Sequence, residues 1–173
     1  MGKDRRRGCF TYKTFIMNII ISPYAKKLRE KDTPHPKNYP FWEELIKLLQ
    51  QDGHTIIQIG IEGEDRLVED CRFGLPSSQL IELCKGADTF ISVENFFPHF
   101  MHFNFKGAKK GIVLFAKSDP EIYGYSENTN LLKDKKYLRW DQFGPWEATD
   151  YIEKAFVEPQ IVIDALSKIN LEK

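Results

Sequence analysis

The sequence contains little of what marks several large protein classes. Only three of its 173 residues are cysteine, and their odd number and wide spacing fit neither a disulfide framework nor a zinc site. No apolar run reaches the roughly 20 residues of a membrane-spanning helix. Lysine plus arginine and aspartate plus glutamate both number 25, and a zero formal net charge argues against a dedicated duplex-DNA binder. We therefore expect a cytoplasmic protein with reduced thiols, no nucleic-acid partner and no membrane span.

Short motifs of the commonest nucleotide-dependent and hydrolytic enzymes are also lacking. The sequence has no GxGxxG, no Walker loop and no GxSxG, and its four histidines do not show an HExxH pattern. We therefore expect neither a metal nor a resident cofactor. What the chain does have is apolar material, because 42% of its residues are hydrophobic and 13 are phenylalanine. That amount suits one domain with one core.

Strand and helix patterns alternate along the chain. Continuous β-branched or apolar runs predict strands at 16–21, 54–60, 89–93 and 112–115, with a weaker strand at 130–133. Helical periodicity predicts helices from Pro40 to Gly53, from Ser77 or Ser78 to Gly86, at 98–105, and from Pro159 onward. The order implies parallel pairing with right-handed crossovers. We expect a Rossmann-like three-layer α/β domain over residues 16–173, after a flexible leader at 1–15.

Ligands of parallel α/β sheets bind beyond the carboxyl ends of the strands, so the loops there carry the candidate residues. Lys37 lies at the end of the loop after the first strand, just before a predicted helix. A lysine beside a helix N-terminus is typical of a phosphate site, and the alternative is a solvated loop lysine. Ser22, at the start of the same loop, could donate its hydroxyl or serve only in the turn.

The loop after the 89–93 strand holds a second pair of candidates. Glu94 falls at the carboxyl edge of the sheet, where a carboxylate can accept hydrogen bonds from sugar hydroxyls. His99 follows within one helical turn and could orient a pyrophosphate or the carboxylate. The alternative is that Glu94 is an ordinary acid at a helix start and that His99 is a partly buried structural side chain.

Two more loops carry weaker signals. Ser118 lies in a segment of small and hydroxyl residues that would let a ligand approach the backbone, and a Ser-Asp-Pro turn explains it equally well. Gly60, together with Glu62 or Glu64, could contact a ribose. One glycine and scattered acids are weak evidence by themselves.

The order of these features resembles a known family. A strand is followed by a loop ending in Lys-x-aromatic-Pro (37–40), a helix carrying Trp42, and a strand ending in Gly60 with a glutamate nearby. A Ser-Val-acid-x-x-x-x-His segment (92–99) and a Val-Leu-Phe-small strand (113–116) come next. This order is similar to the carboxyl-terminal, donor-binding half of heptosyltransferase-type (glycosyltransferase family 9-like) GT-B enzymes, over about residues 19–115.

The resemblance implies a role for each candidate. Lys37 would hold the phosphates of a nucleotide diphosphate sugar, and His99 would stand in the family's histidine position. The other implied donor contacts are Gly60, Glu64, Glu94 and Ser118. We expect Lys37, Glu94 and His99 to take part in catalysis, and Ser22 and Asn95 to help bind the donor. The family usually has Asp-Thr-Gly where this chain has Glu94-Asn95-Phe96. A phenylalanine in place of that glycine would block close approach of a pyrophosphate unless the loop moves.

The resemblance covers only the donor half, and in this family the general base comes from the other half. We therefore expect a domain that binds a nucleotide diphosphate sugar and takes part in inverting glycosyl transfer with an acceptor-domain partner or a second copy. One alternative is a non-catalytic module that binds or sequesters a nucleotide or nucleotide sugar. Another is a homo-oligomeric enzyme similar to nucleoside deoxyribosyltransferases, with Glu94 as nucleophile.

Overall fold

The computed structural model describes residues 15–26 and 34–171. The predicted leader lies outside this part of the chain, except for its last residue. The strands are β1 (Asn18–Ser22), β2 (Thr55–Gly60), β3 (Cys71–Phe73), β4 (Thr89–Val93), β5 (Ile112–Phe115) and β6 (Thr129–Leu132). The α-helices are α1 (Trp42–Gln51), α2 (Ser77–Gly86), α3 (Phe96–Phe105), α4 (Pro120–Tyr123) and α5 (Pro159–Leu171).

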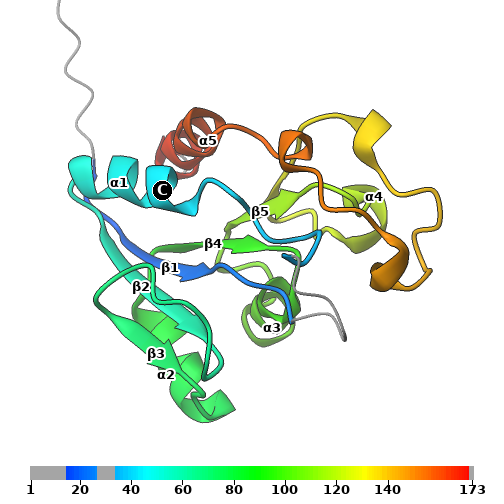
Figure 1. Cartoon of the computed structure of the whole chain (residues 1–173). Coiled ribbons are helices and arrows are strands. Elements are labelled where there is room, and N and C mark those ends of the chain that lie inside the picture. The colour runs from blue at the N-terminus through cyan, green and yellow to red at the C-terminus, as the bar shows by residue number, and fades with distance from the viewer. Residues whose placement is uncertain (1–14, 27–33, 172–173) are drawn as a thin grey trace, which may run out of the picture.

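All six strands form one parallel sheet in the order β3-β2-β1-β4-β5-β6 (Figure 1). The chain builds β1 to β3 in one direction and then returns to build β4 to β6 in the other. The direction of the crossovers therefore reverses between β1 and β4, and a sheet of this kind leaves a crevice beyond the carboxyl ends of those two strands. The predicted α/β, Rossmann-like fold is confirmed.

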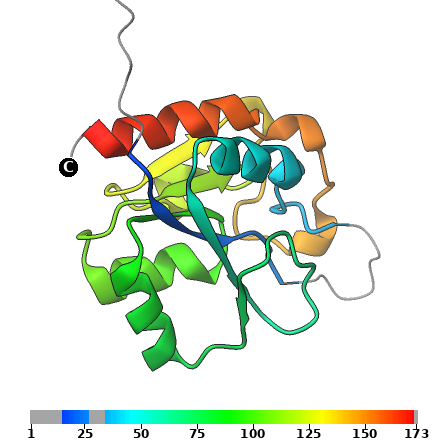
Figure 2. The same ribbon diagram turned by 90° about the vertical axis from the view of Figure 1, so that its left-hand side faces the viewer.

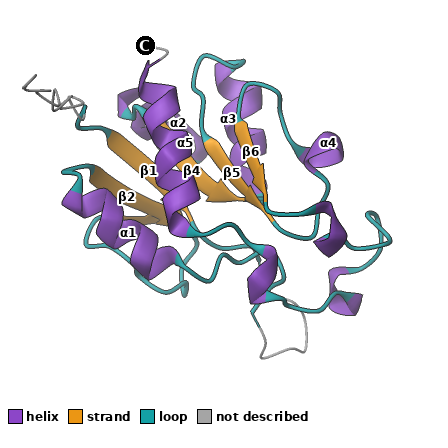
Figure 3. Cartoon of the chain, turned by 90° about the horizontal axis from the view of Figure 1, so that it is seen from above, coloured by secondary structure: helices purple, strands orange, loops and turns teal. Residues whose placement is uncertain are grey.

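Helices cover both faces of the sheet. Helices α1 and α5 pack together on one face, and α2 and α3 lie on the other (Figures 1 and 2). Seen from above, α1 and α5 both lie on the near side of the sheet (Figure 3). Side chains alternate along each central strand, so β1 sends Ile19 and Ile21 into the first layer and Ile20 into the second. The strands are thus buried on both faces, as their continuous apolar runs predict.

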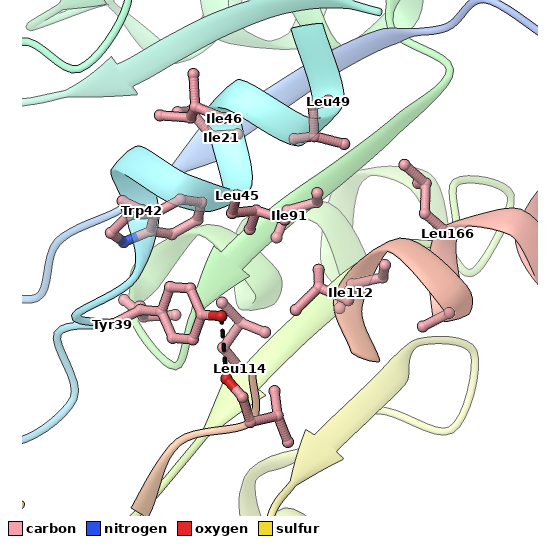
Figure 4. Close-up of a cluster of buried hydrophobic side chains, with 14 of the residues drawn as sticks. Ile21, Tyr39, Trp42, Leu45, Ile46, Leu49, Ile91, Ile112, Leu114 and Leu166 are labelled. Atoms are coloured by element: carbon pink, nitrogen blue, oxygen red, sulfur yellow. Dashed lines mark hydrogen bonds between the residues drawn. The ribbon is translucent and has the colours of Figure 1, made fainter. Parts of the chain in front are cut away.

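An aromatic cluster closes the α1 side of the core. Tyr39 lies edge-on to Trp42 and Phe156, with ring centroids 5.5 and 5.7 Å away. Its hydroxyl donates to the carbonyl of Val157 at 3.0 Å, which joins the segment before α1 to the segment before α5 (Figure 4). Because Tyr39 and Trp42 follow Lys37 closely, this packing anchors the end of the first loop.

Several boundaries differ from the sequence prediction. Helix α1 begins at Trp42, two residues after Pro40, and the N-cap of α2 is Pro76 without a side-chain cap, so a serine cap is wrong. Helix α3 begins at Phe96 because Asn95 caps it. The three-residue strand β3 was not predicted. Within the described residues, no helix is long and apolar enough to cross a membrane.

Candidate functional site

A pocket of about 620 Å³ opens beyond the carboxyl ends of β1, β2 and β4, at the point where the crossover direction reverses. Seven of the eight residues predicted from the sequence line it: Ser22, Lys37, Gly60, Glu64, Glu94, Asn95 and His99. The eighth, Ser118, does not, and the lining also includes the unpredicted residues His35, Arg72, Phe96 and Trp146. Segments that are far apart in the sequence therefore meet around one space.

The centre of the site is an ion pair between Lys37 and Glu94. Lys37 Nζ lies 2.7 Å from Glu94 Oε1, and the side chains are only 16% and 9% exposed. The other carboxylate oxygen, Oε2, accepts a hydrogen bond from the hydroxyl of Ser118, which is almost fully buried. The alternative reading of Lys37 as a solvated loop lysine is therefore wrong. Ser118 connects to the pocket through Glu94.

Trp146 forms one wall of the site. Lys37 Nζ lies 4.4 Å from the centroid of the Trp146 ring system, and the guanidinium carbon of Arg139 lies 3.9 Å from the same centroid. His35 packs beside the indole and accepts the backbone N–H of Lys37 on Nδ1 at 3.1 Å. Burial, aided by the Lys37 charge, lowers the pKa of His35 to about 4, so its imidazole is neutral near pH 7.

Asn95 holds the ends of β1 and β4 together. Its amide Nδ2 donates to Ser22 Oγ at 2.9 Å and to the carbonyl of Tyr24 at 3.0 Å. Its Oδ1 accepts the N–H of Phe97 at 2.8 Å, which caps α3. Ser22 and Asn95 thus bond each other across the switch point, and both border the pocket.

The far side of the pocket is built where β2 ends. Glu64 folds back over Gly60, so that a Cβ at position 60 would stand 1.9 Å from Glu64 Oε2. Only a glycine permits this approach. Burial raises the pKa of the Glu64 carboxyl. The pocket lining also includes apolar side chains, those of Ile59, Ile61 and Leu80.

A chain of aromatic rings leads from the pocket along α3. His99 Nδ1 lies 2.8 Å from the hydroxyl of Tyr125, and the two rings meet edge-to-face. On the ring of Tyr125, His102 stacks with a centroid distance of 3.8 Å, and His102 Nδ1 pairs with Glu127 at 2.5 Å. Burial is the main cause that lowers the pKa of His99.

The helix start that borders the pocket is not the one expected. Residues 95, 96, 97 and 99 at the start of α3 line it, whereas none of the described lining residues belongs to α1. The positive end of the α3 dipole therefore faces the pocket, and Lys37 brings its charge to Glu94, the residue before the Asn95 N-cap of that helix. Phe96, the first residue of α3, is 68% exposed.

Apart from Ser118, sequence reasoning missed the residues that the irregular segment 116–150 supplies. Trp146, Arg139 and Tyr125 come from this segment, which has no periodic pattern. The only available signal was its unusual content of aromatic side chains outside any predicted element. The basic side chains of Lys27, Arg29 and Lys31 in the first loop lie outside the described residues.

Within the described ranges, no three side chains of histidine, cysteine, aspartate or glutamate gather in a way that could hold a metal ion. No family model, no curated protein and no solved structure matches the chain. The site must therefore be interpreted from its own geometry and charges.

Proposed function

We propose that the pocket binds a nucleotide diphosphate sugar and that the chain takes part in glycosyl transfer, with an acceptor-binding partner or a second copy. The observation that supports this most is the convergence of Lys37, Glu94 and Ser118. These residues come from three different loops, and they meet at the edge of the pocket where the crossovers reverse.

Lys37 and the start of α3 would hold the diphosphate. Lys37 is more buried than Lys26 and Arg72, the other lysine and arginine of the described pocket lining. Trp146 beneath it restricts where its ammonium group can go. A lysine charge facing a helix N-terminus is an arrangement that favours phosphate oxygens. As the bond to the sugar breaks, the same charges would stabilise the departing diphosphate.

The two carboxylates suit the neutral, hydroxyl-bearing parts of such a ligand. Glu64 lines the pocket together with the apolar Ile59 and Leu80, beside which a nucleoside would fit, and could accept hydrogen bonds from a ribose. Glu94 lies beside Lys37 and could accept hydrogen bonds from the sugar. A ligand with a charged centre and uncharged ends matches this distribution of charge.

Calorimetric titration of the chain with UDP, ADP and GDP, and with the corresponding nucleosides, tests the proposal. We expect one diphosphate to bind at least tenfold more tightly than its nucleoside, because the Lys37 charge meets only the former. Its nucleotide sugar should bind more tightly still. Equal binding of diphosphates and nucleosides, or no binding across the panel, would refute the proposed function.

A second candidate is a module that binds the nucleotide sugar without catalysing transfer. It is supported by the state of Glu94, because both carboxylate oxygens are already engaged, by Lys37 and by Ser118. With both oxygens engaged in this way, neither is free to attack a sugar carbon, which also counts against the deoxyribosyltransferase alternative. Release of nucleotide from a bound nucleotide sugar, followed with and without acceptors, separates binding from turnover.

A further inference from the structure

We infer that Tyr125 is a positioning residue, which fixes the imidazole of His99 so that its Nε2–H points at the diphosphate of the bound ligand. This inference rests on the proposed function of the pocket. It assigns a role to a loop residue that no sequence motif singles out. The argument depends on the hydrogen bond of His99, on the aromatic stack behind Tyr125 and on the place of His99 in the pocket wall.

The two nitrogens of His99 have different surroundings. Nδ1 is held by the Tyr125 hydroxyl at 2.8 Å. Nε2, on the other side of the ring, has no hydrogen-bond partner among residues 15–26 and 34–171, and it is not among the buried atoms that lack a partner. It is therefore open to solvent, and His99 lines the pocket next to Glu94 and Asn95.

The bond to Tyr125 also selects the tautomer. A phenol is a much better proton donor than a neutral imidazole N–H, and burial raises the pKa of Tyr125, so the hydroxyl keeps its proton. When the hydroxyl donates to Nδ1, the single proton of a neutral imidazole must reside on Nε2. Burial favours the neutral imidazole at pH 7, which makes Nε2 the donor that His99 can offer to a ligand.

Tyr125 is itself held by the stack behind it. The ring of His102 lies nearly parallel to the Tyr125 ring, at an angle of 12°, and Glu127 fixes His102 by a 2.5 Å contact. The His102 ring, itself held by a carboxylate, thus restrains the phenol, and the phenol restrains His99. Such restraint from behind is what a donor needs when it must meet a phosphate oxygen in one geometry.

Replacement of Tyr125 by phenylalanine tests the inference, because the Tyr125→Phe variant keeps the ring and the stack and loses only the hydroxyl. The matched control is Tyr123→Phe, which removes a hydroxyl that bonds the carbonyl of Gln142 instead. Nitrogen-15 NMR of the histidine rings should show His99 protonated mainly on Nε2 in the unmodified chain and in the control. In Tyr125→Phe the Nδ1–H tautomer should become populated.

Calorimetry with the diphosphate that binds best in the nucleotide panel gives the second readout. Tyr125→Phe should weaken binding about three- to tenfold, the scale of one neutral hydrogen bond, and Tyr123→Phe should not. An unchanged tautomer would overturn the inference, as would a changed tautomer with unchanged affinity. If the unmodified chain binds no nucleotide, the proposed function fails and the role toward a diphosphate falls with it, while the tautomer still shows whether Tyr125 orients His99.

Discussion

Both ends of the strands carry buried or half-buried polar side chains, but these side chains do different things at the two ends. At the amino ends they bond backbone groups. His54 accepts the N–H of Met17 at 3.1 Å, Thr89 donates to the carbonyl of Lys110 at 2.8 Å, and Lys109 donates to the carbonyl of Ala87. Each of these bonds satisfies a backbone N–H or C=O group next to the amino end of a strand.

At the carboxyl ends, polar side chains bond one another around an open space. Lys37 pairs with Glu94, Ser118 donates to Glu94, and Asn95 donates to Ser22. These contacts join residues up to 73 positions apart and border a pocket of about 620 Å³. The amino ends thus serve the fold, whereas under the proposed function the carboxyl ends keep charged groups in place for a ligand.

The largest effect should come from separating the ion pair. Lys37→Met should lower the free energy of unfolding by about 3 kcal/mol, because it leaves the nearly buried Glu94 carboxylate without its cation. The double variant Lys37→Met/Glu94→Gln should recover most of that loss, since no charge then remains buried. Urea denaturation measures both values. If Lys37→Met were as stable as the unmodified chain, water would have to solvate Glu94 in place of Lys37. The ion pair would then be more exposed to solvent than described.

The second effect concerns Asn95, which joins two strand ends. Asn95→Ala should cost about 2–3 kcal/mol of unfolding free energy, the sum of a lost N-cap and lost hydrogen bonds to Ser22 and Tyr24. Asn95→Asp is the matched control, because a carboxylate still caps α3 but cannot donate to Ser22. Its cost should be smaller than that of alanine. Equal costs for the two variants would assign the whole effect to the β1–β4 link.

The third effect is a pH dependence that both ends share. His35 and His54 each accept a backbone N–H on Nδ1, and burial lowers the pKa of both. In the folded chain His35 stays neutral down to about pH 4, whereas in the unfolded chain it takes a proton near pH 6.5. Protons therefore favour the unfolded state between these values, and stability is complete above about pH 6.5 and falls as the pH drops toward 4.

For His35 this linkage is worth about 2 kcal/mol at pH 5 relative to pH 7. Urea midpoints at the two pH values should therefore differ less in His35→Gln than in the unmodified chain, since glutamine can accept the Lys37 N–H without titrating. His54→Gln gives the same comparison at the amino ends. An equally large pH effect in His35→Gln would show that His35 is not the group that titrates.

Continuous apolar runs made most of the sheet predictable from the sequence. Strands β1, β4 and β5 are buried on both faces, so their sequences read as uninterrupted runs. Strand β3 escaped prediction because it is three residues long and exposes Arg72 at its centre. Pro98 predicts too late a start for α3, because the Asn95 side chain caps the helix and α3 begins at Phe96, two residues before that proline.

The candidate site was predictable only in part, because local sequence patterns place residues after strands but do not predict their long-range contacts. Lys37 and Glu94 could be placed because each follows a recognisable strand, and parallel strands bring their carboxyl ends to one edge. Their direct contact could not be predicted, because it depends on the path of the first loop. Trp146 and Tyr125 come from the segment 116–150, where long-range packing sets the backbone in place of a local pattern.

The smallest effect should come from the amino ends. Thr89→Val removes the hydroxyl that bonds the Lys110 carbonyl and should cost about 1 kcal/mol of unfolding free energy. It should leave nucleotide affinity unchanged, because Thr89 lies at the other end of β4 from the pocket. A variant that folds well but binds a diphosphate differently would break the division between the two strand ends.

Titration of a nucleoside diphosphate into Lys37→Gln, with Lys133→Gln as the control, tests the central claim most directly. Lys133 pairs with Glu158 at an exposed site outside the pocket lining, so the control removes an equal charge. Lys37→Gln should bind the diphosphate about 10- to 100-fold more weakly, the scale of a charge-assisted hydrogen bond, while nucleoside affinity stays the same. Lys133→Gln should match the unmodified chain in both titrations. Equal diphosphate affinity in all three proteins would contradict the account.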